Sequence, residues 1–282
     1  MKLLRYGSAG SEKPGLLDKD GVIRDLSGVV GDISGAMLSD EGLKKIAALD
    51  PASLPKVSGN PRMGACVSGA GKFIGIGLNF ADHAAETNMP LPSEPIFFMK
   101  ATSCIVGPND NVMKPRDSTK MDWEVELGFV IGKKASYVSE AEALDHIAGF
   151  CLVNDVSERE FQVGRPGGQW DKGKGCDTFG PVGPWLVTKD EIGDTNQLAM
   201  WLEVNGKRYQ DGNSSTMVFK PAFLVSYLSR FFTLHPGDIV TTGTPPGVGM
   251  GQKPNPIFLT VGDVMHLGIQ GLGEQRQKVI AS

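Results

Sequence analysis

Short runs of apolar residues recur between turns rich in glycine and proline over most of the chain. Runs of this length, bounded by turn residues and rich in β-branched and aromatic side chains, are typical of strands. They lie at residues 73–76, 96–99, 125–131, 239–242 and 264–269. The pattern therefore predicts a mainly β core with α+β elements.

A helical periodicity interrupts this pattern once, over residues 222–232. Phe223, Leu224, Tyr227 and Phe231 recur at the spacing that gathers side chains on one side of a helix. We expect one long helix here, packed on the sheet.

The first 65 residues predict a small β/α unit of their own. Residues 3–6 read as a strand, and residues 15–23 read as two short strands joined by an Asp-Gly turn. Ser39 is the expected N-cap of a helix over 43–49, because serine oxygens accept from the free amides of a first helical turn. Three prolines between residues 51 and 61 then break the pattern. We therefore expect a small N-terminal domain over 1–65 and a catalytic domain over 66–282.

Composition argues against several classes of partner and location. The formal net charge is -4, and the basic residues are dispersed among acidic ones, which favours neither nucleic acid nor an anionic membrane as a partner. No apolar run approaches the roughly 20 residues of a membrane span, and the first residues lack the apolar region of a signal peptide. The four cysteines show no C-x-x-C spacing. We expect a reduced, cytoplasmic protein.

Acidic side chains gather in two segments that end near apolar runs. In a strand, Asp122, Glu124 and Glu126 would share one face, where they repel each other. Asp155 follows a second apolar run and precedes a polar, helix-like segment. Each has an ordinary alternative, a solvated sheet face for the first group and a helix cap for Asp155. A set of oxygen ligands without cysteine or histidine points to magnesium, manganese or calcium rather than zinc.

A histidine and a carboxylate stand three residues apart directly after the 73–76 run. His83 and Glu86 would share one side of a helical turn, where the carboxylate makes the imidazole a better base. A surface ion pair is the alternative interpretation. The prolines that follow suit a lid over a site.

Four segments together resemble the fumarylacetoacetate hydrolase family, and they occur in the family's order. They are residues 77–86, 124–128, 154–159 and 242–249, and the resemblance extends over roughly 70–275. It implies a mixed β-roll core preceded by a small N-terminal domain, assembled as a homodimer.

The resemblance also implies roles for single residues. Glu124, Glu126 and Asp155 would be the metal ligands, with Mg²⁺ as the expected ion and Mn²⁺ or Ca²⁺ as alternatives. His83 and Glu86 would form a dyad that activates water, and Lys174 would lie near the metal, with Lys172 as a less favoured neighbour. Asp122 has no matching role. The expected substrate contacts are Arg159, Gln162, Gly243 and Thr244.

The function implied is metal-dependent hydrolysis of a carbon–carbon bond in a small 2,4-diketo acid, either an acylpyruvate or a 2,4-diketo-3-deoxy sugar acid. The departing enolate needs its charge dispersed, which a chelated cation can do. Ureidoglycolate lyase, and decarboxylation or isomerisation of 2-oxo diacids, are alternatives within the family, and a non-catalytic metal-binding module is one outside it. The complete His83/Glu86 pair favours the hydrolase, because hydrolysis needs an activated water.

Overall fold

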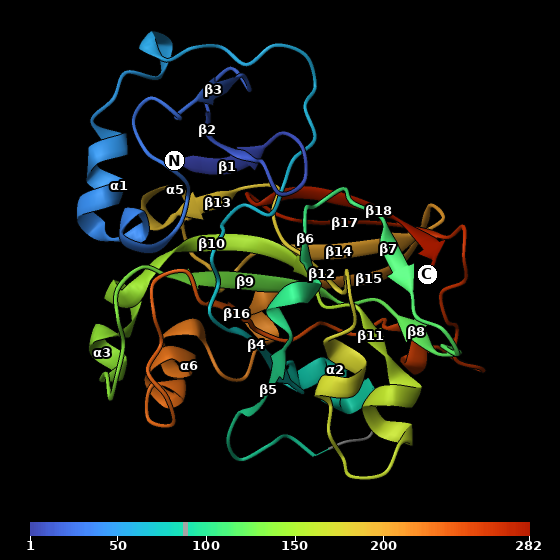
Figure 1. The fold of residues 1–282 in the computed structure, drawn as a ribbon. Helices are drawn as coiled ribbons and strands as arrows, with labels where there is room; N and C mark the ends of the chain where they lie inside the picture. Colours follow the sequence, from blue (N-terminus) through green and yellow to red (C-terminus); the bar gives the residue numbers. More distant parts are fainter. Residues whose placement is uncertain (87–89) are drawn as a thin grey trace.

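Two β-sheets form the body of the protein, as the apolar pattern predicts (Figure 1). The computed structural model describes residues 1–86 and 90–282, with the side chains of residues 83–85 outside that description. The large sheet has, in spatial order, β3 (Ile23–Asp25), β2 (Lys13–Leu17), β1 (Lys2–Tyr6), β13 (Leu186–Thr188), β10 (Ile147–Asn154), β9 (Val125–Ile131), β16 (Ile239–Thr241), β4 (Phe73–Gly77) and β5 (Ile96–Lys100).

The second sheet packs on the middle of the first. Its order is β15 (Lys207–Asn213), β14 (Ala199–Val204), β17 (Val264–Ile269), β18 (Gly273–Ala281) and β7 (Val112–Lys114). Strands β14 and β17 contact β9, while β17 and β18 contact β10. All residues of β9 and β10 are buried, so these two strands form the centre of the core. Two short pairs complete the strands, β11 (Ser157–Glu158) with β8 (Met121–Asp122) and β12 (Gly180–Pro181) with β6 (Ile105–Val106).

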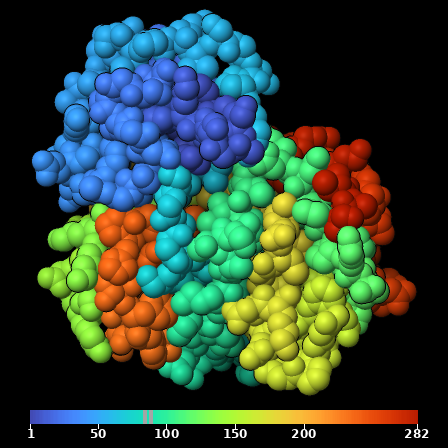
Figure 2. Space-filling view, in the orientation of Figure 1, coloured from blue at the N-terminus to red at the C-terminus, as the bar shows by residue number. Residues whose placement is uncertain are grey.

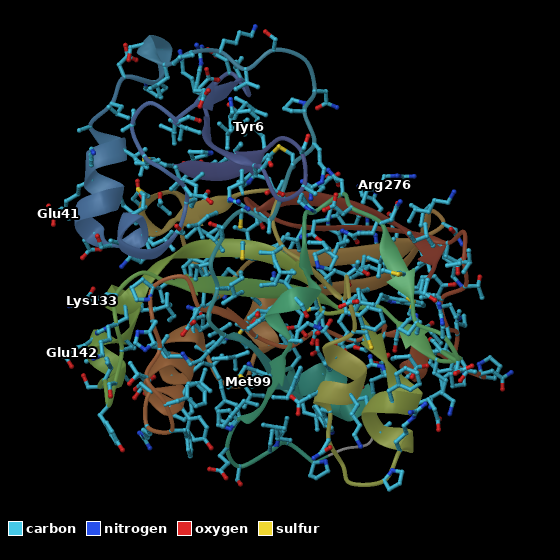
Figure 3. All side chains as sticks on the ribbon, in the orientation of Figure 1. Tyr6, Glu41, Met99, Lys133, Glu142 and Arg276 are labelled. Carbon is cyan, nitrogen blue, oxygen red and sulfur yellow. The ribbon has the colours of Figure 1, made fainter. Side chains whose placement is uncertain are left out.

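The helices are short and lie around the sheets. In Figure 1, α3 and α6 lie together at one end of the large sheet, and side chains of α1 and α3 such as Glu41 and Glu142 lie at the outer edge of the molecule in Figure 3. Within the described residues, every helix is too short or too polar to cross a membrane. The α-helices are α1 (Asp40–Ala47), α2 (Ala81–Glu86), α3 (Glu140–Ala143), α4 (Asp171–Lys174), α5 (Lys189–Ile192) and α6 (Pro221–Leu228). The tighter or wider turns are η1 (Gly35–Leu38), η2 (Pro51–Ser53), η3 (Thr102–Cys104), η4 (Leu144–His146), η5 (Glu160–Gly164), η6 (Ser214–Thr216) and η7 (Gly249–Gly251).

The N-terminal segment forms the blue lobe at the top of Figure 2 and also extends the large sheet. Strand β1 pairs with β2 on one side and with β13 on the other. The expected N-cap is present, since the Ser39 hydroxyl accepts from the amide of Gly42 at 3.2 Å. The division of the chain at residue 65 stays a prediction.

Two predicted elements differ from the structure. The helix expected over 222–232 begins at Pro221 and ends at Leu228. Beyond it, the chain turns, with the Ser229 hydroxyl donating to the carbonyl of Ser226, while Phe231 leaves the helix and packs against Phe97. The expected strand from residue 122 is divided into β8 and β9, so Trp123 and Glu124 lie between strands.

Candidate functional site

A cavity of about 290 Å³ opens at the ends of β4 and β10 and the start of β9, beside the middle of β5. Ligand pockets for small molecules begin at about this size. Its lining combines charged groups, most of them buried, with apolar and aromatic side chains. The predicted site residues among the lining are Glu124, Glu126, Asp155, Arg159, Gln162, Lys174 and Thr244.

The pairing of β9 with β10 brings the three predicted metal ligands together. Glu126 lies opposite Val153, and the Asp155 amide donates to the Glu124 carbonyl at 2.9 Å. One carboxylate oxygen of each of Glu124, Glu126 and Asp155 lies within 4.8 Å of the others, and all three residues are buried. The start of one antiparallel strand lies beside the end of the other, which explains how residues 126 and 155 meet.

The electrostatics of this cluster fit a divalent cation. Burial, followed by the charges of Asp155 and Glu124, raises the pKa of Glu126 well above its usual range. Thr241 Oγ1 and the amide of Gly243 donate to Glu126 Oε2 at 2.6 and 2.8 Å. Glu124 and Asp155 also pair with cationic side chains, whereas these two donors to Glu126 are uncharged. A bound cation would offset the charge of Glu126, and an all-oxygen set suits Mg²⁺, Mn²⁺ or Ca²⁺. The residues present therefore fit the expected metal.

Lys174, at the end of α4, bridges two of these carboxylates. Its Nζ lies 2.7 Å from Glu124 Oε2 and 2.7 Å from Asp155 Oδ2. Burial lowers the pKa of Lys174, but the charges of Asp155 and Glu124 outweigh it and raise that pKa, so the ammonium stays protonated. Lys172, by contrast, is exposed and donates to the Pro166 carbonyl at 3.4 Å. Of the two lysines, the structure brings Lys174 into the cavity.

A second buried lysine, Lys100, was missed by the sequence reasoning. It is the last residue of β5, and its Nζ lies 2.5 Å from Asp155 Oδ1 and 2.5 Å from the Lys174 carbonyl. It is 2% exposed, and lysines are rarely buried unless paired. The sequence signal that could have identified Lys100 is its place directly after the apolar run 96–99.

Asp122 has a defined place behind the cavity. Its carboxylate accepts from Arg159 Nε at 2.8 Å and from the amides of Gly249 and Met250 at 2.6 and 3.0 Å. Arg159 also donates to Glu124 Oε1 at 2.6 Å and to Gln162 Oε1 at 2.9 Å. Burial lowers the pKa of Arg159, whereas Asp122 and Glu124 raise it further, so the guanidinium is fully charged.

Two of the expected substrate contacts bind other parts of the protein. The Gly243 amide donates to Glu126, as described above. Thr244 Oγ1 donates to the Val125 carbonyl at 2.9 Å and accepts from Gln210 Nε2 at 2.7 Å. Thr244 lines the cavity, and its role as a substrate contact stays a prediction.

Helix α2 carries the predicted dyad and docks on the loop after β16. Both oxygens of Glu86 accept from the Gly247 amide, at 3.0 and 3.3 Å. A Cβ on Gly251 would lie 2.9 Å from the Glu86 carboxyl carbon, so this glycine leaves room for the carboxylate. The His83 side chain lies outside the described residues, and its role stays a prediction.

Comparison with known proteins shows the family to which this chain is related. A family model described as fumarylacetoacetate (FAA) hydrolase C-terminal matches residues 72–280. A chain from Burkholderia orbicola (strain MC0-3) that is named as a hydrolase is 64% identical over 278 residues, covering 99% of this chain and 98% of the relative.

Solved structures match over the whole chain. Fumarylacetoacetate hydrolase from Exiguobacterium antarcticum is 32% identical, with a TM-score of 0.89 and 100% of both chains covered. Maleylpyruvate hydrolase from Sphingobium sp. SYK-6, solved with manganese(II) and pyruvate, is 27% identical, with a TM-score of 0.82 and 100% of both chains covered.

Proposed function

Because this chain belongs to the fumarylacetoacetate hydrolase family and is an enzyme of the hydrolase type, we propose that it hydrolyses a carbon–carbon bond in a small 2,4-diketo acid with the help of a divalent cation. The observation that carries the proposal is the buried cluster of Glu124, Glu126 and Asp155 within the cavity. Clustered buried carboxylates are costly unless a positive charge offsets them.

Glu124, Glu126 and Asp155 would hold the cation, with Mg²⁺ expected and Mn²⁺ or Ca²⁺ as alternatives. When bound, the ion would act as a Lewis acid that polarises the keto oxygen of a 2-oxo acid. The manganese and pyruvate bound by the Sphingobium enzyme support this choice of ion class and of product.

Lys174 would stabilise charge that develops during the reaction. Its protonated ammonium, held between Glu124 and Asp155, lies on the cavity wall. It can donate a hydrogen bond to an oxygen that becomes negative, an effect that is strong in a site with little water.

His83, oriented by Glu86, would act as the general base. The imidazole takes a proton from water, whose oxygen attacks the carbonyl at position 4 of the substrate. The bond between carbons 3 and 4 breaks, its electron pair passes into the enolate of pyruvate, and a proton then returns to carbon 3. The products are pyruvate and a carboxylic acid. Residues 83 and 86 share one side of α2, which is compatible with the pair.

The test is a steady-state screen of Mg²⁺-loaded protein with an EDTA-treated control. The substrates are acylpyruvates, 2,4-diketo-3-deoxy sugar acids, oxaloacetate and ureidoglycolate, followed by loss of enol absorbance and by product analysis. Cleavage of a diketo acid that EDTA abolishes is expected. Urea release from ureidoglycolate alone would replace the hydrolase with a lyase, and Mg²⁺ binding without any turnover would favour a binding module.

A variant distinguishes the base from the metal site. His83→Ala should lower kcat by at least about a hundredfold, a typical loss for a general base, while Mg²⁺ affinity measured by calorimetry is unchanged. Near-normal turnover of this variant would remove His83 from the mechanism.

Homodimer formation and a cytoplasmic location are further proposals. Light scattering coupled to gel filtration tests the first, and fractionation of cells tests the second. A monomer in solution would contradict the dimer.

A further inference from the structure

We propose that the substrate carries a single carboxylate and that its far end is a compact, uncharged group lying against the rings of Phe98 and Trp170. This inference rests on the proposed function and narrows it to a class of substrates. It excludes diketo diacids as the preferred substrates. Two features of the cavity carry it, namely its aromatic wall and its engaged cations.

The aromatic wall is built into the backbone of β4. Phe98 and Trp170 pack with their ring centroids 5.6 Å apart. A Cβ on Gly75 would lie 2.3 Å from the Phe98 ring, and a Cβ on Gly77 would lie 2.4 Å from the Trp170 ring. Gly75 and Gly77, two residues apart on β4, therefore leave the space that the rings of Phe98 and Trp170 occupy. The rings form one apolar side of the cavity, and an uncharged group can lie on them without losing hydrogen bonds to water.

The apolar lining continues to the mouth of the cavity. Val163, on η5, is 53% exposed, and Met250, on η7, is 41% exposed, although both line the cavity. Exposed apolar side chains at a pocket mouth favour an apolar partner. Val163 and Met250 offer a second carboxylate neither a charge nor a hydrogen bond from their side chains.

The cations of the cavity are already engaged. Among the described lining residues, the positively charged side chains are Arg159 and Lys174. Arg159 is bonded to Asp122, Glu124 and Gln162, and Lys174 is bonded to Glu124 and Asp155. Lys174 Nζ also lies 5.2 Å from the centroid of the Phe98 ring, but its hydrogen bonds to Glu124 and Asp155 already engage its charge. Among the described lining residues, no third cation lies near Phe98 and Trp170.

The first experiment measures binding and does not depend on turnover. Calorimetry with Mg²⁺-loaded protein compares 2-oxohexanoate with 2-oxoadipate, which have equal carbon chains and differ only in a second carboxylate. The monoacid should bind at least about tenfold more tightly, because an unpaired desolvated charge is costly. Equal or tighter binding of the diacid would overturn the inference even if the proposed function holds.

The second experiment measures cleavage of a matched pair, butanoylpyruvate and succinylpyruvate. The monoacid should have a kcat/KM at least about tenfold higher. If neither compound nor any other diketo acid is cleaved, the proposed function fails, while the binding comparison still decides the charge preference. Faster cleavage of succinylpyruvate would contradict the inference and leave the proposed function standing.

A variant adds the missing cation. Val163→Lys should reduce the monoacid preference by about fivefold or more in both experiments, since it places an ammonium at the far end. Val261→Lys is the matched control, because Val261 is 56% exposed and lies outside the cavity. Met250→Lys repeats the test from η7, another element of the lining. An unchanged preference in both cavity variants, each with a normal thermal transition, would show that the far end of the substrate lies elsewhere.

Discussion

The carboxylate of Asp122 connects the guanidinium of Arg159 to the loop that receives helix α2. It accepts from Arg159 Nε at 2.8 Å and from the amides of Gly249 and Met250 at 2.6 and 3.0 Å. The same loop donates the Gly247 amide to Glu86 of α2. The cavity arginine and the predicted lid are therefore held by neighbouring parts of one loop.

Removing the charge of Asp122 should loosen this connection. In Asp122→Asn, Arg159 keeps its ion pair with Glu124 but loses the buried negative charge of Asp122. We therefore expect kcat/KM to fall by about tenfold to a hundredfold and unfolding to occur at a lower urea concentration. Steady-state kinetics and urea titration measure the two effects. Asp20→Asn, at an exposed position, is the control and should change neither. Full activity of Asp122→Asn would show that Arg159 is positioned without it.

Neutralising Glu126 should have opposite effects on stability and on metal binding. Burial and the charges of Asp155 and Glu124 raise the pKa of Glu126, so Glu126→Gln relieves repulsion and should leave the metal-free protein as stable or more stable. It also removes a ligand, so Mg²⁺ affinity should fall by at least about tenfold. Thermal unfolding in the presence of EDTA measures the change in stability, and calorimetry with Mg²⁺ measures the change in affinity. The exposed Glu142→Gln is the control, and unchanged Mg²⁺ affinity in Glu126→Gln would exclude Glu126 as a ligand.

Lys100 should contribute to stability through Asp155. Lys100→Met leaves one oxygen of a buried carboxylate without its cation, and we expect a loss of about 3–5 kcal/mol in the free energy of unfolding. Urea titration of the metal-free protein measures it. The control is Lys172→Met, because that lysine is exposed. If both variants unfold alike, the bond to Asp155 adds no net stability.

The N-terminal segment should confer an acid-sensitive part of the stability. Burial raises the pKa of Glu12, but the hydrogen bond from Arg62 and the charges of Arg5 and Arg62 outweigh it and lower that pKa below the usual value of 4.5 for glutamate. A carboxyl whose pKa is lower in the folded state stabilises the fold above its unfolded pKa, and this contribution is lost as the pH falls through the folded pKa. Glu12→Gln should therefore be less stable than the natural protein at pH values above 4.5, with the difference shrinking in more acidic solution.

Urea titrations of both proteins across this pH range, with the exposed Glu41→Gln as the control, measure the difference. A difference that is constant with pH would mean that Glu12 acts through packing rather than through its charge.

Local patterns determined the strands and the metal candidates. Residues 125–131 and 264–269 alternate or run apolar between turn residues, and both form strands with those bounds. A strand pattern depends only on residues that are close together in the chain, so it can be identified from a single sequence. The ordered motifs around Glu124, Glu126 and Asp155 likewise identified residues that the structure brings together.

Tertiary structure alone decided how the charges of the site are paired. Lys100 meets Asp155 from 55 positions away, and Arg159 meets Asp122 from 37 positions away. The spacing of residues along the chain does not predict these contacts, because they depend on the order of strands in the sheet and on how the loops pack beside them. The aromatic wall has the same origin, since Gly77 makes room for a ring of Trp170 that reaches it only after the chain has folded. The sequence determined which residues could bind a cation, while the packing of β4, β5, β9 and β10 decided which charges remain available to a substrate.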